Sequence, residues 1–347
     1  MDSFAQSLKA YGALYQRCID AVRQVDKNHL IVCEQMYGRL KDARCYDLEI
    51  PAFPSLREEN LMYEYHDYAP ADFCFQGDWK EPGTVYGSPI LSDFGLRRGE
   101  KVLAPERVDA AVMNGGFTSL CSGPLAPHGG KSLAASLVVA LVGDIPQEAA
   151  AWSDDWRVRA FDAAGQNRGV VYSSGVDNAF SVRRLVYEEY TGKVSFDEAA
   201  GAAAPGSLRV SDTKGRIELC SWSKDLFRVR PGWFYTVEAS FKGEGLPNTV
   251  YAQVGLQFWE SPVYGHLFGM DREMIAASTA RFSDWRDVHN YPVYCGEWGA
   301  MYTALAPGMN AEQWADDVLS VFLEQKMYFA VHSQYAMYGP ESQPTFA

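Results

Sequence analysis

The sequence has no long apolar run, no metal-binding cysteine pattern and no basic stripe. No stretch of its 347 residues reaches the roughly 18 apolar residues that a transmembrane helix needs, so no membrane partner is expected. Its seven cysteines show neither Cys-x-x-Cys spacing nor a cluster with histidine, which argues against a disulfide framework, a zinc site or another metal cofactor. Lys+Arg total 31 against Asp+Glu 44, and a chain with net charge −13 repels phosphate backbones, so nucleic acid is not an expected partner.

Aromatic residues, by contrast, are abundant. They make up 14% of the sequence, with 20 tyrosines and 9 tryptophans. Flat apolar rings are the surfaces on which sugar rings stack, although protein cores use the same residues. The composition therefore favours a carbohydrate-related function without establishing one. The first residues, MDSFAQSLKA, lack the charged-then-apolar layout of a signal peptide, and the sequence leaves the cellular location open.

Two regions, residues 1–97 and 264–347, alternate amphipathic helices with short apolar strands. Helices are expected at about 8–25, 271–289 and 311–326, and strands at 30–33, 61–66, 292–295 and 328–332. Asn310 is placed to cap the start of the last helix with its side chain. Helix–strand alternation of this kind predicts a parallel sheet covered by helices.

The region between them, residues 98–263, has a different pattern. Alternating strands separated by turn signals are expected at 207–210, 216–219, 233–239 and 250–258. The alanine-rich stretch 198–205 is expected to be a flexible connection. Several short strands at such spacing predict an antiparallel β-sandwich. About 165 residues are too many for a loop, so this region is expected to be an inserted domain.

Polar residues follow each of the four apolar strands of the outer regions. They are Glu34 with Gln35, His66 with Tyr68, Glu297, and His332. Active residues in parallel α/β folds lie at the carboxyl ends of strands, so these side chains are expected to share one edge of the sheet.

Glu297 is the strongest candidate for a catalytic group. Gly296 and Gly299 flank it, and glycine allows the backbone to approach a ligand closely. Cleavage of a glycosidic bond with retention needs one carboxylate as nucleophile and a second as acid/base, about 5 Å away. The alternative is a glutamate that merely ends a strand.

The other strand ends admit both functional and structural interpretations. His66 and Tyr68 are two residues apart, so both rings can face one cavity, and a tyrosine hydroxyl there can orient a carboxylate. Glu34 is either a second catalytic acid or a group that binds a sugar hydroxyl. His332, and the His66–Tyr68 pair itself, could equally be structural residues satisfied by backbone carbonyls.

The order of these segments resembles glycoside hydrolase family 5, the cellulase-like family of clan A. YQRCIDAVRQVDKNHLIV (15–32) is similar to the family's fourth helix and fifth strand, YEYHDYAP (63–70) to its sixth strand, and PVYCGEWGA (292–300) to its seventh strand. The resemblance implies a partial (β/α)8 TIM barrel, strands five to eight, interrupted by the inserted sandwich.

The resemblance also implies a function. It makes the chain part of a retaining glycoside hydrolase that acts on β-linked glucan or mannan, needs no cofactor, and uses Glu297 as nucleophile. The residues implied to bind substrate are His66, Tyr68, Glu34, Trp298 and His332. Residues 207–261 look similar to carbohydrate-binding modules, in which Trp222, Trp233 or Trp259 could extend the sugar cleft; core packing is the favoured role for Trp233 and Trp259.

Two departures limit the resemblance: residues 98–263 stand where the family has an ordinary loop, and the partner carboxylate is missing. The family's acid/base glutamate follows an asparagine at the end of the fourth strand, and no Asn-Glu pair occurs in this sequence. We therefore expect a truncated reading frame whose N-terminal half-barrel lies elsewhere, with pairing of two copies as an alternative, and no glycosidase activity from these residues alone. The remaining functional alternatives are a non-catalytic carbohydrate-binding protein and an interaction protein that works through the sandwich.

Overall fold

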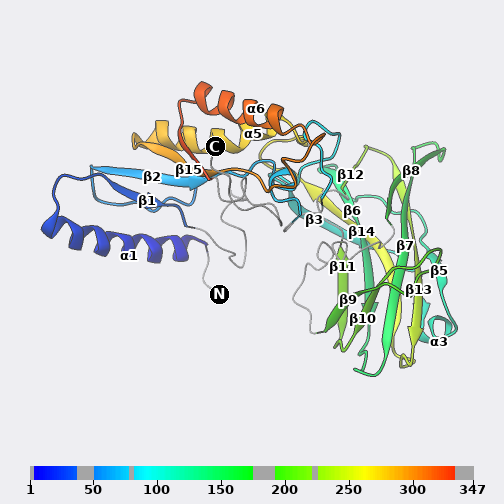
Figure 1. The fold of residues 1–347 in the computed structure, drawn as a ribbon. Helices are drawn as coiled ribbons and strands as arrows, with labels where there is room; N and C mark the ends of the chain where they lie inside the picture. The colour runs from blue at the N-terminus through cyan, green and yellow to red at the C-terminus, as the bar shows by residue number, and fades with distance from the viewer. Residues whose placement is uncertain (1–3, 37–50, 78–81, 175–191, 221–225, 333–347) are drawn as a thin grey trace. The chain divides into compact units, whose positions relative to one another are not determined.

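The computed structural model describes residues 4–36, 51–77, 82–174, 192–220 and 226–332 (Figure 1). The chain forms two compact units, one made of residues 1–95 with 268–347 and the other of residues 96–267. These limits lie close to the sequence-based boundaries at 97 and 263.

The first unit contains the predicted alternation of helices and strands. Its elements are α1 (Phe4–Val25), β1 (Ile31–Glu34), β2 (Leu61–His66), α2 (Ala71–Cys74), α5 (Arg272–His289), β15 (Val293–Trp298), α6 (Ala311–Glu324) and β16 (Tyr328–Val331). The strands form one open sheet in the order β1-β2-β15-β16, and every neighbouring pair is parallel. The predicted parallel sheet is confirmed. Among the described helices, none is long and apolar enough to cross a membrane.

The two faces of this sheet differ sharply, as β2 shows. Its burial alternates, with Tyr63 and Tyr65 buried and the intervening residues partly exposed. The buried rings pack against α5: Tyr65 stacks on Phe282 with ring centroids 3.7 Å apart, and Tyr63 meets Trp285 edge-on at 4.9 Å. Because side chains alternate along a strand, Glu64 and His66 project from the opposite face, away from α5.

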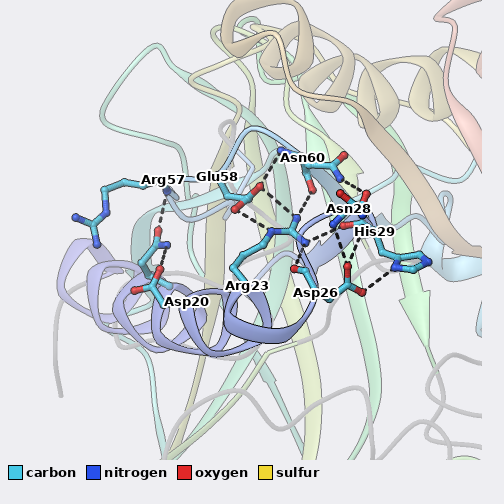
Figure 2. Close-up of polar contacts among 9 residues, drawn as sticks. Asp20, Arg23, Asp26, Asn28, His29, Arg57, Glu58 and Asn60 are labelled. Carbon is cyan, nitrogen blue, oxygen red and sulfur yellow. Dashed lines mark hydrogen bonds and ion pairs between the residues drawn. The ribbon is translucent and has the colours of Figure 1, made fainter.

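An arginine ties the end of α1 to the beginnings of β1 and β2 (Figure 2). The Arg23 guanidinium donates to the carbonyl oxygens of His29 at 2.9 Å and Asn60 at 3.3 Å, and its Nε lies 3.1 Å from a carboxylate oxygen of Glu58. The Asn60 carbonyl also accepts the Ile31 N–H, where β1 begins. This network lies at the amino ends of the strands, opposite the edge where the candidate site residues lie.

Replacing Arg23 with alanine is expected to lower the free energy of unfolding of the first unit by about 1–3 kcal/mol, because Glu58 and the carbonyl oxygens of Asp26, His29 and Asn60 lose a largely buried cation. Denaturant unfolding followed by hydrogen exchange of the β1 and β2 amides measures this. Arg57→Ala, at an exposed position beside the same network, is the control. It should change the free energy of unfolding by less than about 0.5 kcal/mol. Equal effects of the two substitutions would contradict the role given to Arg23.

The second unit consists of antiparallel strands in two sheets. Its elements are β3 (Arg97–Leu103), β4 (Val108–Asp109), α3 (Ala110–Met113), β5 (Thr118–Cys121), β6 (Ser132–Val142), β7 (Ala150–Phe161), β8 (Asn167–Ser174), β9 (Lys193–Asp197), β10 (Ser207–Ser211), β11 (Arg216–Cys220), β12 (Phe227–Arg228), β13 (Phe234–Glu244) and β14 (Tyr251–Glu260). One sheet has the order β5-β13-β7-β10-β9, with β8 beside β7, and the other has the order β11-β6-β14-β3, with β12 beside β6 and β4 beside β14.

Residues from both sheets share one buried core. Val139 of β6 and Val237 of β13 belong to the same buried apolar cluster. Trp259 is 2% exposed and its indole N–H donates to Ser136 Oγ at 2.9 Å, which agrees with the core role favoured for it. Trp233 is partly buried against the same cluster. Trp222 lies outside the described residues.

One local expectation needs correction. Asn310 precedes α6, but its backbone is left-handed at φ 60° and its side chain makes no capping hydrogen bond; the amide donates to the Tyr86 carbonyl oxygen instead, at 2.9 Å. The alanine-rich stretch 198–205 joins β9 to β10, as a connection should. Two of its N–H groups are hydrogen-bonded: Asp197 Oδ1 accepts the Ala199 N–H, and Asp154 Oδ2 accepts the Ala202 N–H.

Candidate active site

A β-bulge near the end of β15 sets the direction of Glu297. Cys295 lies opposite Tyr65 of β2, but Glu297 lies opposite His66, so two steps along β15 match one step along β2. Strict alternation would place Glu297 on the same face as the buried Cys295, against the helices. The extra residue, Gly296, turns Glu297 to the face that carries His66. Bulges near active sites commonly redirect a side chain in this way.

The same bulge sends Trp298 to the helix-covered face. Its side chain is 6% exposed and packs against Trp314 and Phe322 of α6, with ring centroids 5.6 and 6.0 Å away. Trp298 is therefore the one predicted substrate-binding residue that the structure does not bring to the polar cluster, because the bulge shifts the alternation by one residue.

Three side chains converge on one carboxylate oxygen of Glu297. The Tyr68 hydroxyl donates to Oε2 at 2.8 Å, and the Nδ1 atoms of His66 and His332 each lie 3.2 Å from the same oxygen. The Glu297 side chain is 33% exposed, so the carboxylate is held by its neighbours and is still accessible to solvent. The sequence-based grouping of Glu297 with His66, Tyr68 and His332 thus corresponds to one physical cluster.

The turn after β2 is anchored through Asp67. The backbone N–H of Asp67 donates to the Glu297 carbonyl oxygen at 3.0 Å. Its buried carboxylate accepts hydrogen bonds from Ser278 at 3.1 Å and Thr279 at 3.3 Å, both on α5, and burial raises the pKa of this carboxyl group. Asp67 lies between His66 and Tyr68, so these contacts fix the segment that carries both site residues.

Glu34 reaches the cluster from β1. A carboxylate oxygen of Glu34 lies 3.4 Å from His66 Nε2, on the side of the imidazole that faces away from Glu297. Burial is the main cause that raises the pKa of Glu34; His66 opposes the shift, and the nearby carboxylates of Glu64 and Glu297 add to it.

The raised pKa of Glu34 predicts a pH-dependent difference between the wild type and Glu34→Gln. An acid whose pKa is raised by folding favours the folded state while protonated, and this contribution is lost as the pH rises through the folded-state pKa. The unfolding free energy of the wild type should therefore fall relative to Glu34→Gln as the pH rises above 4.5, the ordinary pKa of a glutamate, by less than about 1 kcal/mol because Glu34 is 42% exposed. Thermal unfolding of both proteins across this range measures it, and a difference that does not vary with pH would contradict it.

Two further residues belong to the cluster and were not singled out from the sequence. Glu64 Oε1 lies 3.7 Å from His66 Nε2. Tyr294 lies opposite Glu64 in the sheet register, and its pKa is raised to about 12, first by burial and then by the charge of Glu64 and a hydrogen bond to it. The signal was present in the strand pattern, because Glu64 is two residues from His66 and so shares its face.

The arrangement suits chemistry at a carboxylate. In the described part of the chain, no group of three or more His, Cys, Asp and Glu side chains has the geometry of a metal site. A partly exposed carboxylate with one oxygen fixed by a hydroxyl and two imidazoles can attack an electrophilic carbon or stabilise a cation that forms beside it.

Comparison with known protein families places part of the chain. Residues 6–102 match the family model described as Cellulase (glycosyl hydrolase family 5). The matched segment includes Glu34, His66 and Tyr68, whereas Glu297 and His332 lie outside it. No curated protein matches the chain.

Proposed function

We propose, from the match of residues 6–102 to the glycosyl hydrolase family 5 model, that the chain is part of a retaining glycoside hydrolase that cleaves β-linked glucan or mannan. The observation that carries the proposal is the position of Glu297: a bulge turns it to the face of His66, and Tyr68, His66 and His332 hold one of its oxygens.

In the proposed mechanism Glu297 is the nucleophile. With Oε2 fixed by Tyr68 and the two histidines, Oε1 attacks the anomeric carbon and forms a glycosyl ester, while the bond to the leaving oxygen breaks. Water then hydrolyses the ester and regenerates the carboxylate. Tyr68 contributes by orienting the carboxylate, since attack requires the reacting atoms to be aligned.

Glu34 fits a sugar-binding role better than the acid/base role. The glycosidic oxygen must lie between the acid/base and the nucleophile, but here the His66 ring lies between Glu34 and Glu297, with one nitrogen near each. We therefore assign Glu34 to binding a sugar hydroxyl, as expected from the resemblance, and infer that the acid/base comes from elsewhere.

We propose that the open sheet of the first unit is strands five to eight of a (β/α)8 barrel. Its edge strands expose apolar side chains: Val32 of β1 is 43% exposed, and Tyr328 and Val331 of β16 are 71% and 57% exposed. Edges of this kind invite pairing with further strands. In this proposal a half-barrel with strands one to four covers them and supplies the acid/base, and residues 98–263 form an inserted β-sandwich resembling carbohydrate-binding modules.

A non-catalytic carbohydrate-binding protein is the alternative. The observation that favours it is the same interposed His66 ring, which leaves Glu297 without an acid/base partner among the described carboxylates of its own cluster. Such a protein would bind β-linked oligosaccharides through the cluster and would not cleave them.

Dependence on the leaving group separates these possibilities. An aryl 2-deoxy-2-fluoro-β-glycoside with a dinitrophenolate leaving group needs no protonation to react, so the nucleophile alone can form the glycosyl ester. We expect the 347-residue chain to become labelled on Glu297, as located by peptide mass spectrometry, and to show no turnover of alkyl β-glycosides, which require an acid.

Each outcome has a distinct meaning. Oligosaccharide binding measured by calorimetry, without labelling, would support the binding protein. Neither labelling nor binding would reject the proposed function for the chain. Turnover of alkyl β-glycosides that survives purification would support hydrolysis and overturn the inference that the acid/base is missing.

A further inference from the structure

We propose that Glu64 is a positioning residue that fixes the orientation of the His66 ring, and that position 296 is glycine because the Glu64 carboxylate occupies the place of its side chain. The functional consequence rests on the proposed role of Glu297; the positioning itself does not.

The first argument is steric. A Cβ atom on Gly296 would lie 1.7 Å from Glu64 Oε1 and 2.4 Å from its carboxyl carbon. Cβ contacts below 3.0 Å essentially never occur, so any side chain at position 296 would displace the carboxylate. Glu64 thus packs directly against the backbone of the bulge that turns Glu297 towards His66.

The second argument concerns how Glu64 is held. Its side chain is 20% exposed, less than half the value for Glu34. Tyr294, its register partner on β15, shares a side-chain hydrogen bond with it. A phenol whose pKa is about 12 stays protonated at neutral pH, so Tyr294 acts as the donor and holds the carboxylate in place.

The third argument concerns the two nitrogens of His66. Nε2 lies 3.4 Å from Glu34 and 3.7 Å from Glu64, whereas Nδ1 lies 3.2 Å from Glu297. An ionised carboxylate only accepts hydrogen bonds, so both ring nitrogens face acceptors, Nδ1 towards Glu297 and Nε2 towards Glu34 and Glu64. Glu64, on the same strand as His66 and less exposed than Glu34, therefore favours a donor at Nε2 and keeps the Nδ1 edge directed at Glu297.

The ring nitrogens of His66 can be observed directly by NMR of the full chain labelled with ¹⁵N-histidine, with His66→Gln identifying the signals among the six histidines. In the wild type we expect a proton on Nε2. In Glu64→Gln, which keeps the shape and removes the charge, we expect the Nε2 proton to exchange with water severalfold faster and both ring nitrogen signals to move. Gly296→Ala should produce the same change although Glu64 is still present, because the new methyl group displaces its carboxylate.

Glu312→Gln is the matched control, because it removes one negative charge from an exposed position on α6 of the same unit. It should leave the His66 signals unchanged. Wild-type-like His66 signals in Glu64→Gln, or loss of the folded first-unit spectrum in both Glu64→Gln and Gly296→Ala, would overturn the proposal; the second result would show a purely structural role.

The labelling reaction adds a functional readout. Glu64→Gln should slow covalent labelling of Glu297 by about tenfold, with oligosaccharide binding changed less than twofold, because a misdirected His66 affects attack more than binding. If the wild type is not labelled, the proposed function fails while the NMR measurement still decides the role of Glu64. Normal labelling in a variant with altered His66 signals would confine Glu64 to orienting the ring and overturn the functional consequence.

Discussion

Replacing Glu297 with glutamine is expected to reduce covalent labelling by the activated 2-fluoro-glycoside on the order of 10³-fold or more. An amide cannot form the glycosyl ester, although glutamine keeps the size of the side chain and can still accept the hydrogen bond from Tyr68. Intact-protein mass spectrometry against time measures the loss, and a spectrum of the folded protein checks that the cluster is intact.

Two outcomes bear directly on the role of Glu297. The Glu312→Gln control, exposed on α6, should be labelled at the wild-type rate. Labelling of Glu297→Gln at a normal rate, with the sugar attached to Glu34 or Glu64, would show that another carboxylate is the nucleophile and that the bulge does not select the reactive group.

The second large effect is on stability. Phe282→Ala is expected to lower the unfolding free energy of the first unit by about 3–5 kcal/mol. Phe282 is 1% exposed, stacks on Tyr65 at 3.7 Å, and lies under the Arg281 guanidinium, which is 4.7 Å from its ring centroid. Removing the ring opens a cavity between α5 and β2, directly behind the strand that carries His66.

Hydrogen exchange gives the appropriate measurement, because it reports each unit separately. Amides of β2 and α5 should lose protection while those of β6 and β13 in the second unit should not. Val288→Ala on the same helix is the control, because Val288 is 78% exposed. This substitution should lower the unfolding free energy by less than about 0.5 kcal/mol. Comparable losses in the two variants would contradict the importance assigned to the buried ring.

Much of the first unit could be predicted because its strands have simple patterns. The strands at 61–66 and 328–332 correspond to β2 and β16, and the helix expected at 271–289 corresponds to α5. In β2 buried and partly exposed side chains alternate, and α5 buries one face, so the core imposes a regular spacing on the sequence there. All four residues of β16 are exposed, and its apolar run alone carried that prediction.

The second unit was predicted less completely. The strand expected at 250–258 corresponds to β14, but β6 and β7 were not foreseen. Residues 134–141 of β6 are all buried, so no solvent-facing side leaves an alternating pattern, and the strand is rich in alanine and serine, which favour strands weakly.

The candidate site was predictable as a set of strand ends and not as a geometry. Apolar strands followed by Glu297, His66 and His332 indicated one edge of a sheet, where these side chains do lie together. The bulge at Gly296 could not be read from the pattern, because it depends on pairing with β2. For that reason Trp298 was expected at the site and lies behind it. Glu64 was missed although its spacing of two residues from His66 carried the signal.

The bulge makes the chemistry of this edge depend on how β15 pairs with β2. If β15 kept Gly296 but paired with β2 without the bulge, Glu297 and Trp298 would swap sides. The carboxylic acid would then be driven among the rings of α6 and the indole of Trp298 would take its position beside His66. Loss of the bulge alone would exchange a reactive surface for an inert one while leaving the number of strands and their order unchanged.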